Sequence, residues 1–331
     1  MNKTGKFVIS LDFELLWGMR DHKTIEDYGE NILGVWDVVP RMLKLFDKYD
    51  VAATFATVGF LFASKKEELL EFSPQIKPGY SNINLSPYNG HFDLVKDSES
   101  EDRYHFASEL IALIRQYPAQ EIATHTYSHY YCNSDGQTIE DFRRDIEAAI
   151  AIANRDGIRI QSLVFPRNMF NEEYIRVCEE NGISSYRGNE EVWFHKSEGK
   201  TSKIKGMSMR GFRLLNSYLN ISGHHCYTYE EMAAERPYNI PSSRFLRPYS
   251  SRLRFFEGLR KKRILKSMTY AAKRNLMFHL WWHPHNFGKD QEENFALLEA
   301  ILKHYKELNA KYGFTSITMG ALAEEMDRNN G

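Results

Sequence analysis

The sequence predicts an α/β protein in which short strands alternate with helices, built as one barrel or as two modest domains. Three observations support this class. Lys6–Glu14 alternates apolar and polar residues as a strand does. Helical periodicity over Val35–Tyr49 is followed by a β-rich run over Val51–Val58, which completes a strand–helix–strand unit. Residues 276–283 alternate again before Pro284 stops the strand.

The first strand would present two different faces. Its apolar set is Phe7, Ile9, Leu11 and Phe13, and its other set is Val8, Ser10, Asp12 and Glu14. In a parallel barrel the apolar set lies under helices and the other set lines the interior. Asp12 and Glu14 would then lie together near the carboxyl end of the strand, where barrel active sites are built.

The remaining elements follow in order along the chain. We expect helices at 103–117, 139–155, 172–181 and 292–312, strands at 162–165, 184–186 and 315–318, and a short closing helix. Two loop-rich inserts are expected, at about 73–102 and 189–250, and the first is a candidate cover for the active site. The whole chain, 1–331, is predicted to form a single catalytic domain.

Composition narrows the class of protein. Apolar residues make up 42% and charged residues 26%, as in ordinary soluble globular proteins, and a net charge of -1 argues against general nucleic-acid binding. The three cysteines are scattered and form no CxxC pair, which fits a reducing compartment. Because the sequence shows neither a signal-type apolar segment nor a run of about 18 apolar residues, we expect a cytoplasmic protein.

Two histidines give the strongest chemical signal. A spacing of four places His125 and His129 on one side of a helical turn, close enough to share a metal ion. Two imidazoles and a carboxylate form the ligand set of a catalytic zinc site with an open position for water. Asp12 and Glu14 could supply that carboxylate, and a metal ion would offset the repulsion between two inward-facing acids. These residues predict a metal-dependent hydrolase.

Five segments, in this order, resemble the NodB-like polysaccharide deacetylases, carbohydrate esterase family 4. They are Ser10–Glu14, Ala52–Gly59, His125–His129, Phe165–Asn168 and Leu280–His283. The resemblance spans roughly residues 6–320. It implies a distorted (β/α) barrel of about seven parallel strands. It also implies removal of acetyl from an N-acetylated sugar, or less readily an O-acetylated one, in the synthesis of cell-surface polysaccharide.

The resemblance also implies roles for individual residues. A divalent ion, zinc first among the candidates, would be held by Glu14, His125 and His129. The catalytic set would be Asp12 as general base, Arg167 as the partner that orients it, and His283 as general acid with His285 as its substitute. The expected partner is a carbohydrate, and no nucleic acid is expected.

The sequence departs from the family pattern in two places. The family has two adjacent aspartates, whereas here Phe13 separates Asp12 from Glu14, so either carboxylate could be the metal ligand. Arg167 follows Pro166 instead of preceding it. Two alternatives therefore stay open: an amidase acting on a small non-sugar C–N bond, and a non-catalytic sugar-binding protein on the same fold.

One segment bears on the form of the substrate. Ser251–Arg274 holds nine basic residues and a single acid, Glu257, so its local net charge is +8. Its apolar residues fall at roughly helical spacing: Leu253, Phe256, Ile264, Met268 and Ala271. One interpretation is a helix packed on the barrel with a solvated basic face. The other is that this face meets an anionic partner, either a phosphate- or lipid-linked sugar or an anionic membrane.

Overall fold

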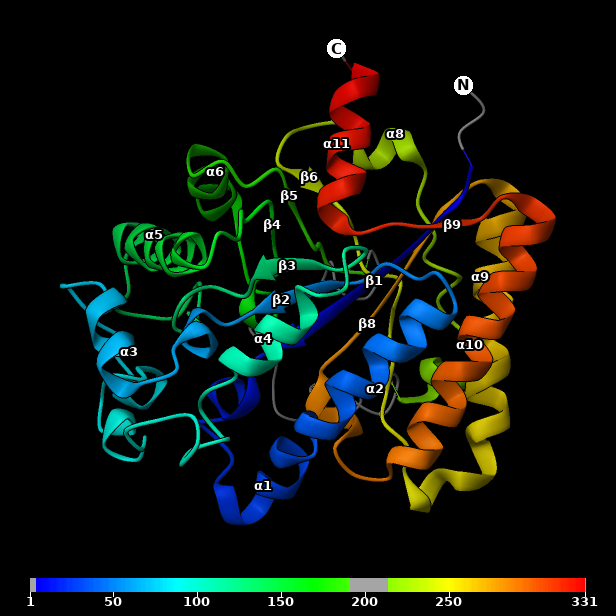
Figure 1. Ribbon diagram of the computed structural model, residues 1–331. Helices are drawn as coiled ribbons and strands as arrows, with labels where there is room; N and C mark the ends of the chain where they lie inside the picture. The colour runs from blue at the N-terminus through cyan, green and yellow to red at the C-terminus, as the bar shows by residue number, and fades with distance from the viewer. Residues whose placement is uncertain (1–3, 191–213, 331) are drawn as a thin grey trace.

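The computed structural model describes residues 4–190 and 214–330, and a curled parallel β-sheet forms its centre (Figure 1). The strands are β1 (Lys6–Phe13), β2 (Thr54–Thr57), β3 (Glu121–Thr124), β4 (Ser162–Leu163), β5 (Ser185–Tyr186), β6 (Tyr238–Asn239), β7 (Arg244–Phe245), β8 (Met277–Trp282) and β9 (Thr315–Ser316). Their order is β6-β5-β4-β3-β2-β1-β8-β7, and β9 pairs with β1. The predicted (β/α) barrel class is confirmed, with eight strands in series instead of about seven.

The barrel is open between β6 and β7, which lie at the two ends of the strand order. Only the residues between Asn239 and Arg244 connect these edges. Because an extended chain spans at most about 3.6 Å per residue, the edges lie within roughly 18 Å of each other without pairing. The sheet is therefore curled so that its two edge strands approach each other.

The predicted faces of β1 are confirmed. Phe7, Ile9, Leu11 and Phe13 belong to the large core shared with the helices. Val8, on the other face, belongs to a smaller interior core that also contains Met277 of β8 and Met319. Since strands on both sides of β1 run parallel to it, the carboxyl ends of β1, β2 and β8 meet at one end of the barrel.

Helices surround this sheet. They are α1 (Ile25–Leu33), α2 (Val35–Lys48), α3 (Lys66–Phe72), α4 (Ser108–Ile114), α5 (Ile139–Arg155), α6 (Glu172–Glu180), α8 (Tyr229–Met232), α9 (Glu257–Arg274), α10 (Gln291–Tyr312) and α11 (Met319–Asn330). In Figure 1, α2, α9 and α10 cover one side and α5 and α6 the other. α11 packs on the interior core through Met319, Leu322 and Met326, and so closes the end at which β1 begins.

Local sequence explains why α5 starts where predicted. Thr138 accepts a hydrogen bond from the backbone N–H of Asp141, and the Asp141 carboxylate accepts one from the N–H of Thr138. This reciprocal capping satisfies two backbone donors that a helix start otherwise leaves unpaired. The helix begins at Ile139 and ends at Arg155, as expected.

Both expected inserts lie largely within the described residues. The described part of the stretch 189–250 contains the short elements α8, β6 and β7, and residues 191–213 lie outside the described residues. The stretch 73–102 is irregular, as predicted, and contacts the site: the backbone N–H of Tyr131 donates to the Tyr80 hydroxyl at 3.0 Å. None of the described helices is long and apolar enough to cross a membrane.

Candidate active site

The two predicted acids lie at the carboxyl end of β1. Asp12 is within the strand and Glu14 directly follows it, and both side chains are buried. Phe13 between them points into the outer core, so the alternation of the strand turns both carboxylates toward the interior. A single apolar residue between two acids is what places both acids on one face.

The histidine segment follows β3 and is a loop, so the predicted helical turn is wrong. Thr126 and His129 have φ angles of 64° and 53°, in the left-handed region, which an α-helix does not contain. The Thr126 hydroxyl accepts a hydrogen bond from the N–H of Tyr130 at 2.7 Å. The loop nonetheless brings the rings of His125 and His129 to a centroid distance of 5.0 Å.

Neighbouring elements hold this loop in place. Asp145 of α5 accepts hydrogen bonds from the N–H groups of Tyr127, at 2.7 Å, and Ser128, and also from the Ser128 hydroxyl. The N–H of Gly59 donates to the Thr126 carbonyl at 2.9 Å. A Cβ on Gly59 would lie 2.4 Å from the Tyr127 ring, so only glycine allows this close approach.

Glu14, His125 and His129 form a group that could hold a metal ion. One ligand atom from each lies within 4.8 Å of the others. The Nε2 atoms of His125 and His129 lie 3.3 and 3.1 Å from Glu14 Oε2. His125 Nδ1 lies 2.7 Å from the Val164 carbonyl, to which it donates, so Nε2 is the ring nitrogen that faces the carboxylate.

The charge states of this group fit a metal site. Burial opposes ionisation of Glu14, but His283, His125 and His129 outweigh it and hold the pKa of that carboxyl well below its usual value. Burial lowers the pKa of His129 to about 4, against the pull of Glu14. Near neutral pH the group therefore offers an anionic carboxylate and a neutral imidazole, the forms that bind a divalent ion.

Arg187 is the partner of Asp12, and the predicted pairing with Arg167 is wrong. The Nη1 and Nη2 atoms of Arg187 donate to Asp12 Oδ1 and Oδ2 at 2.6 and 2.8 Å. The guanidinium is fully buried and lies 4.1 Å from the ring centroid of Trp281. Burial raises the pKa of Asp12, but the opposing effect of Arg187, His283 and His125 is larger. The pKa of Asp12 is therefore lowered from its usual value.

Arg167 lies at the rim instead. It bonds to Asp21 and lies 4.1 Å from the centroid of the Tyr131 ring. Its φ of 57°, directly after Pro166, lies in the left-handed region, and 40% of its side chain is exposed. The alternation of β5 held a signal for Arg187: the Ser185 hydroxyl contacts that of Ser162 inside the barrel, and Arg187 is two residues further along the same face.

The two candidate general acids differ in exposure. His283 keeps 23% of its side chain exposed, and its Nε2 lies 3.6 Å from both Asp12 Oδ2 and Glu14 Oε1. His285 is buried, with Nδ1 at 4.0 Å from Glu14 Oε1. Burial is the main cause, and the nearby His283 the next, that lowers the pKa of His285 to about 3. This ring is therefore neutral near pH 7. Of the two, His283 is better placed to donate a proton to a group entering from solvent.

One buried histidine was not singled out in the sequence. His279 of β8 contacts the Ser10 hydroxyl through Nε2 at 2.8 Å, and Arg187 Nη1 donates to the same hydroxyl at 3.1 Å. Burial lowers the pKa of His279 to about 3. This neutral ring is therefore linked to the Arg187–Asp12 pair through the Ser10 hydroxyl.

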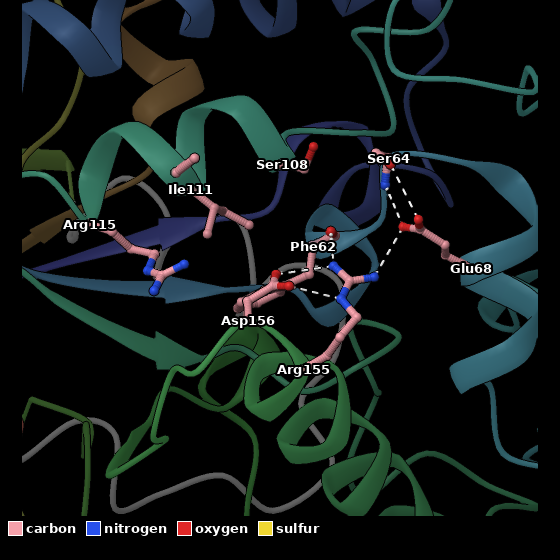
Figure 2. Close-up of a pocket in the computed structure, with 9 residues that line it drawn as sticks. Phe62, Ser64, Glu68, Ser108, Ile111, Arg115, Arg155 and Asp156 are labelled. Atoms are coloured by element: carbon pink, nitrogen blue, oxygen red, sulfur yellow. Dashed lines mark hydrogen bonds and ion pairs between the residues drawn. The ribbon is translucent and has the colours of Figure 1, made fainter.

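A cavity of about 310 Å³ lies elsewhere, outside the sheet (Figure 2). It is lined by Phe62, Ser64, Glu68, Ser108, Ile111, Ala112, Arg115, Arg155 and Asp156, none of them a site residue. Asp156 and Glu68 both pair with Arg155 there. The cavity is therefore not part of the candidate active site.

Comparisons with known proteins bear on the family and on the fold. Residues 27–186 match the family model described as polysaccharide deacetylase. A solved structure from Mycobacterium smegmatis, named as a provisional polysaccharide deacetylase, covers 100% of this chain and 92% of its own at 15% identity and a TM-score of 0.61. No curated protein sequence matches the chain significantly.

Two further structures are more distant. A family 4 carbohydrate esterase from Streptomyces lividans, in complex with acetate, is 10% identical, with 94% of this chain and 91% of that chain covered and a TM-score of 0.40. A family 4 pseudoenzyme from Bacillus anthracis is 12% identical, with 98% and 67% covered and a TM-score of 0.45.

The fold and the matched residues define the class: a (β/α) barrel of the kind found in carbohydrate esterase family 4. Over residues 27–186 the chain matches the polysaccharide deacetylase family model, and the resemblance predicted from its motifs is confirmed.

Proposed function

We propose that the protein is a metal-dependent deacetylase that removes the acetyl group from an N-acetylated sugar. The observation that carries the proposal is the buried Glu14, His125 and His129 group directly beside the Asp12–Arg187 pair. A ligand group for a divalent ion and an ionised base lie together at the end of the barrel where such enzymes react.

Glu14, His125 and His129 would hold the metal, and zinc suits a set of two imidazoles and one carboxylate. A bound divalent ion would polarise the acetyl carbonyl and lower the pKa of water at the site. Glu14 is favoured over Asp12 as the ligand because both carboxylate oxygens of Asp12 are already engaged by Arg187.

The protein residues would move the protons. Asp12, kept ionised and oriented by Arg187, takes a proton from the water that attacks the acetyl carbonyl. His283, partly exposed and 3.6 Å from Asp12, gives a proton to the departing amine. An amide requires this protonation, because an amine anion is a very poor leaving group. His285 packs against the ring of His283, at a centroid distance of 4.9 Å, and fixes its orientation.

The proposed substrate is a sugar in a precursor of cell-surface polysaccharide, carried in a phosphate- or lipid-linked form. The exposed lysines and arginines of α9 support an anionic carrier. The proposed setting is the cytoplasm, in keeping with three free cysteines, of which Cys132 and Cys178 are buried.

Metal removal tests the proposal. Release of acetate from N-acetyl sugars should stop in chelated protein and return on addition of zinc. His125→Ala should lose bound metal, whereas Asp12→Asn should keep the metal and lose roughly 100- to 10,000-fold in rate. Full activity in metal-free protein would refute the proposal.

The same assays separate the alternatives. Turnover of small amides without turnover of N-acetyl sugars would identify an amidase. Metal loss in Asp12→Asn combined with metal retention in Glu14→Gln would exchange the two carboxylate roles. A protein with no affinity for zinc and no turnover would be a sugar-binding member of the family.

A further inference from the structure

Large apolar side chains stand exposed where α9 begins. Phe255 is 82% exposed, Phe256 50% and Leu259 44%. The sequence pattern placed Phe256 on the buried face of the helix; that face does contain Ile264 and Met268, but half of Phe256 is exposed, and its ring lies 6.0 Å from that of Tyr218. Single exposed apolar residues are ordinary, whereas a contiguous group of large ones marks an interaction surface. We call Phe255, Phe256 and Leu259 the apolar tip.

Basic residues flank the apolar tip on both sides. The exposed ones nearest to it are Arg252, Arg254, Lys261, Lys262 and Lys266. None of these five forms an ion pair with another residue in the described part of the chain. Their charge is therefore available to an external anion.

Two arginines counted with the basic face in the sequence turn inward instead. Arg260 and Arg263 are buried, and Arg260 pairs with Glu257, the one acid of the segment. Arg260 also donates to the carbonyls of Arg247 and Pro248. Because the charges of Arg260 and Glu257 cancel in this pair, the positive charge of the five exposed residues around the apolar tip is not reduced by it.

The apolar tip lies at the same end of the barrel as the candidate active site. The chain leaves β7, passes through the 3-10 turn at Ser251–Phe256, and returns along α9 to the start of β8. Segments that follow the carboxyl end of a parallel barrel strand lie at the active-site end. Figure 1 agrees, since the beginning of α9, in yellow, and α1 lie at the lower end of the molecule, toward which β1 and β8 run.

An anionic lipid surface fits this combination. Phenylalanine and leucine side chains enter the boundary between headgroups and acyl chains, while lysine and arginine beside them bind acidic headgroups. A second copy of the chain fits poorly, because it would bring two sets of five unpaired basic residues together. We propose that the apolar tip and its basic neighbours dock the protein on an anionic membrane with the active-site end facing the bilayer. The docking proposal rests on the proposed function in one respect: docking would present a lipid-linked sugar to the active site.

Vesicle co-sedimentation tests the docking. The full-length protein is mixed with phosphatidylcholine vesicles, or with vesicles that also contain phosphatidylglycerol, at low and at high salt. Binding is expected only to the anionic vesicles and should weaken with salt. Phe255→Ser with Phe256→Ser, and separately Lys261→Glu with Lys262→Glu, should each lower the partition coefficient about tenfold or more.

Matched controls lie on other surfaces. Ile76→Ser with Ile83→Ser removes side chains that are 57% and 61% exposed in the 73–102 insert. Lys303→Glu with Lys311→Glu makes the same charge change on the exposed face of α10. Both controls should bind vesicles as the unchanged protein does.

Several results would overturn the docking proposal: no binding to anionic vesicles, equal binding by the tip variants and the controls, or salt-insensitive binding to neutral vesicles. Tip-dependent dimerisation or nucleic-acid binding without vesicle binding would assign the surface to another partner. The tip variants should keep full activity on a soluble N-acetyl sugar, which also shows that they fold. Vesicle binding by a protein without deacetylase activity would sustain the docking and refute the proposed function alone.

Discussion

Arg187 shows how a single side chain can define the state of a catalytic carboxylate. Its two hydrogen bonds occupy both oxygens of Asp12, and a third, at 2.9 Å, reaches Asn168 Oδ1. A planar guanidinium can make this two-point contact, whereas a lysine ammonium acts as a point charge. Because the pair is buried, loss of the arginine charge would leave an uncompensated carboxylate, at a cost of about 3–5 kcal/mol. Lysine keeps the charge and loses the geometry.

We therefore expect Arg187→Lys to lower kcat for an N-acetyl sugar by about 100-fold while bound metal is retained, because the orientation of Asp12 is lost. The matched change Arg167→Lys, at the exposed ion pair with Asp21, should lower kcat by less than about fivefold. The measurements are steady-state kinetics and metal content. A larger loss of kcat in Arg167→Lys than in Arg187→Lys would mean that Arg167 orients Asp12, as the sequence suggested.

At the scale of elements, α5 and the turn after β2 shape the ligand loop. Asp145 is buried, and three donors of the loop converge on its carboxylate. Burial raises the pKa of Asp145 to about 6, although those hydrogen bonds oppose the shift. Outer contacts of this kind fix ligand orientation in metal sites.

Asp145→Asn should weaken zinc binding by roughly 10- to 100-fold, because the amide NH₂ would face loop donors that need an acceptor. Asp141→Asn is the control on the same helix: it removes the negative charge at the start of α5 and should cost about 0.3–1 kcal/mol of stability without changing metal affinity. Metal titration and thermal unfolding measure the two effects separately. Equal zinc affinity in the two variants would mean that the loop holds its shape without Asp145.

At the scale of the whole molecule, the ligand group joins distant parts of the chain. Glu14 follows β1, and the two histidines follow β3, two strands away in the sheet. Such a group exists only in the folded barrel, so metal binding should favour the folded state over the unfolded one.

Zinc at about 100 times its dissociation constant should therefore raise the free energy of unfolding by about 2.7 kcal/mol. His125→Ala should abolish this increase, and His22→Ala, at a side chain 49% exposed, should preserve it. Thermal unfolding with and without zinc provides the measurement. An equal increase in His125→Ala would place the zinc at other residues.

The sequence by itself determined what depends on local pattern. Alternation over β1 gave its two faces, helical periodicity gave the bounds of α5, and the family motifs gave the barrel class and the residues that gather around Glu14. Each of these follows from residues a few positions apart, where side-chain period and backbone hydrogen bonding dictate the outcome.

Only the tertiary structure decided which distant residues meet. Arg187 lies 175 positions from Asp12, and the pairing depends on the register of several parallel strands. The left-handed residues in the histidine loop depend on packing against Gly59 and Asp145. The inward turn of Arg260 depends on carbonyls before α9. The spacing of two distant residues in the sequence does not give the distance between them in the folded chain. These contacts therefore depend on the tertiary structure.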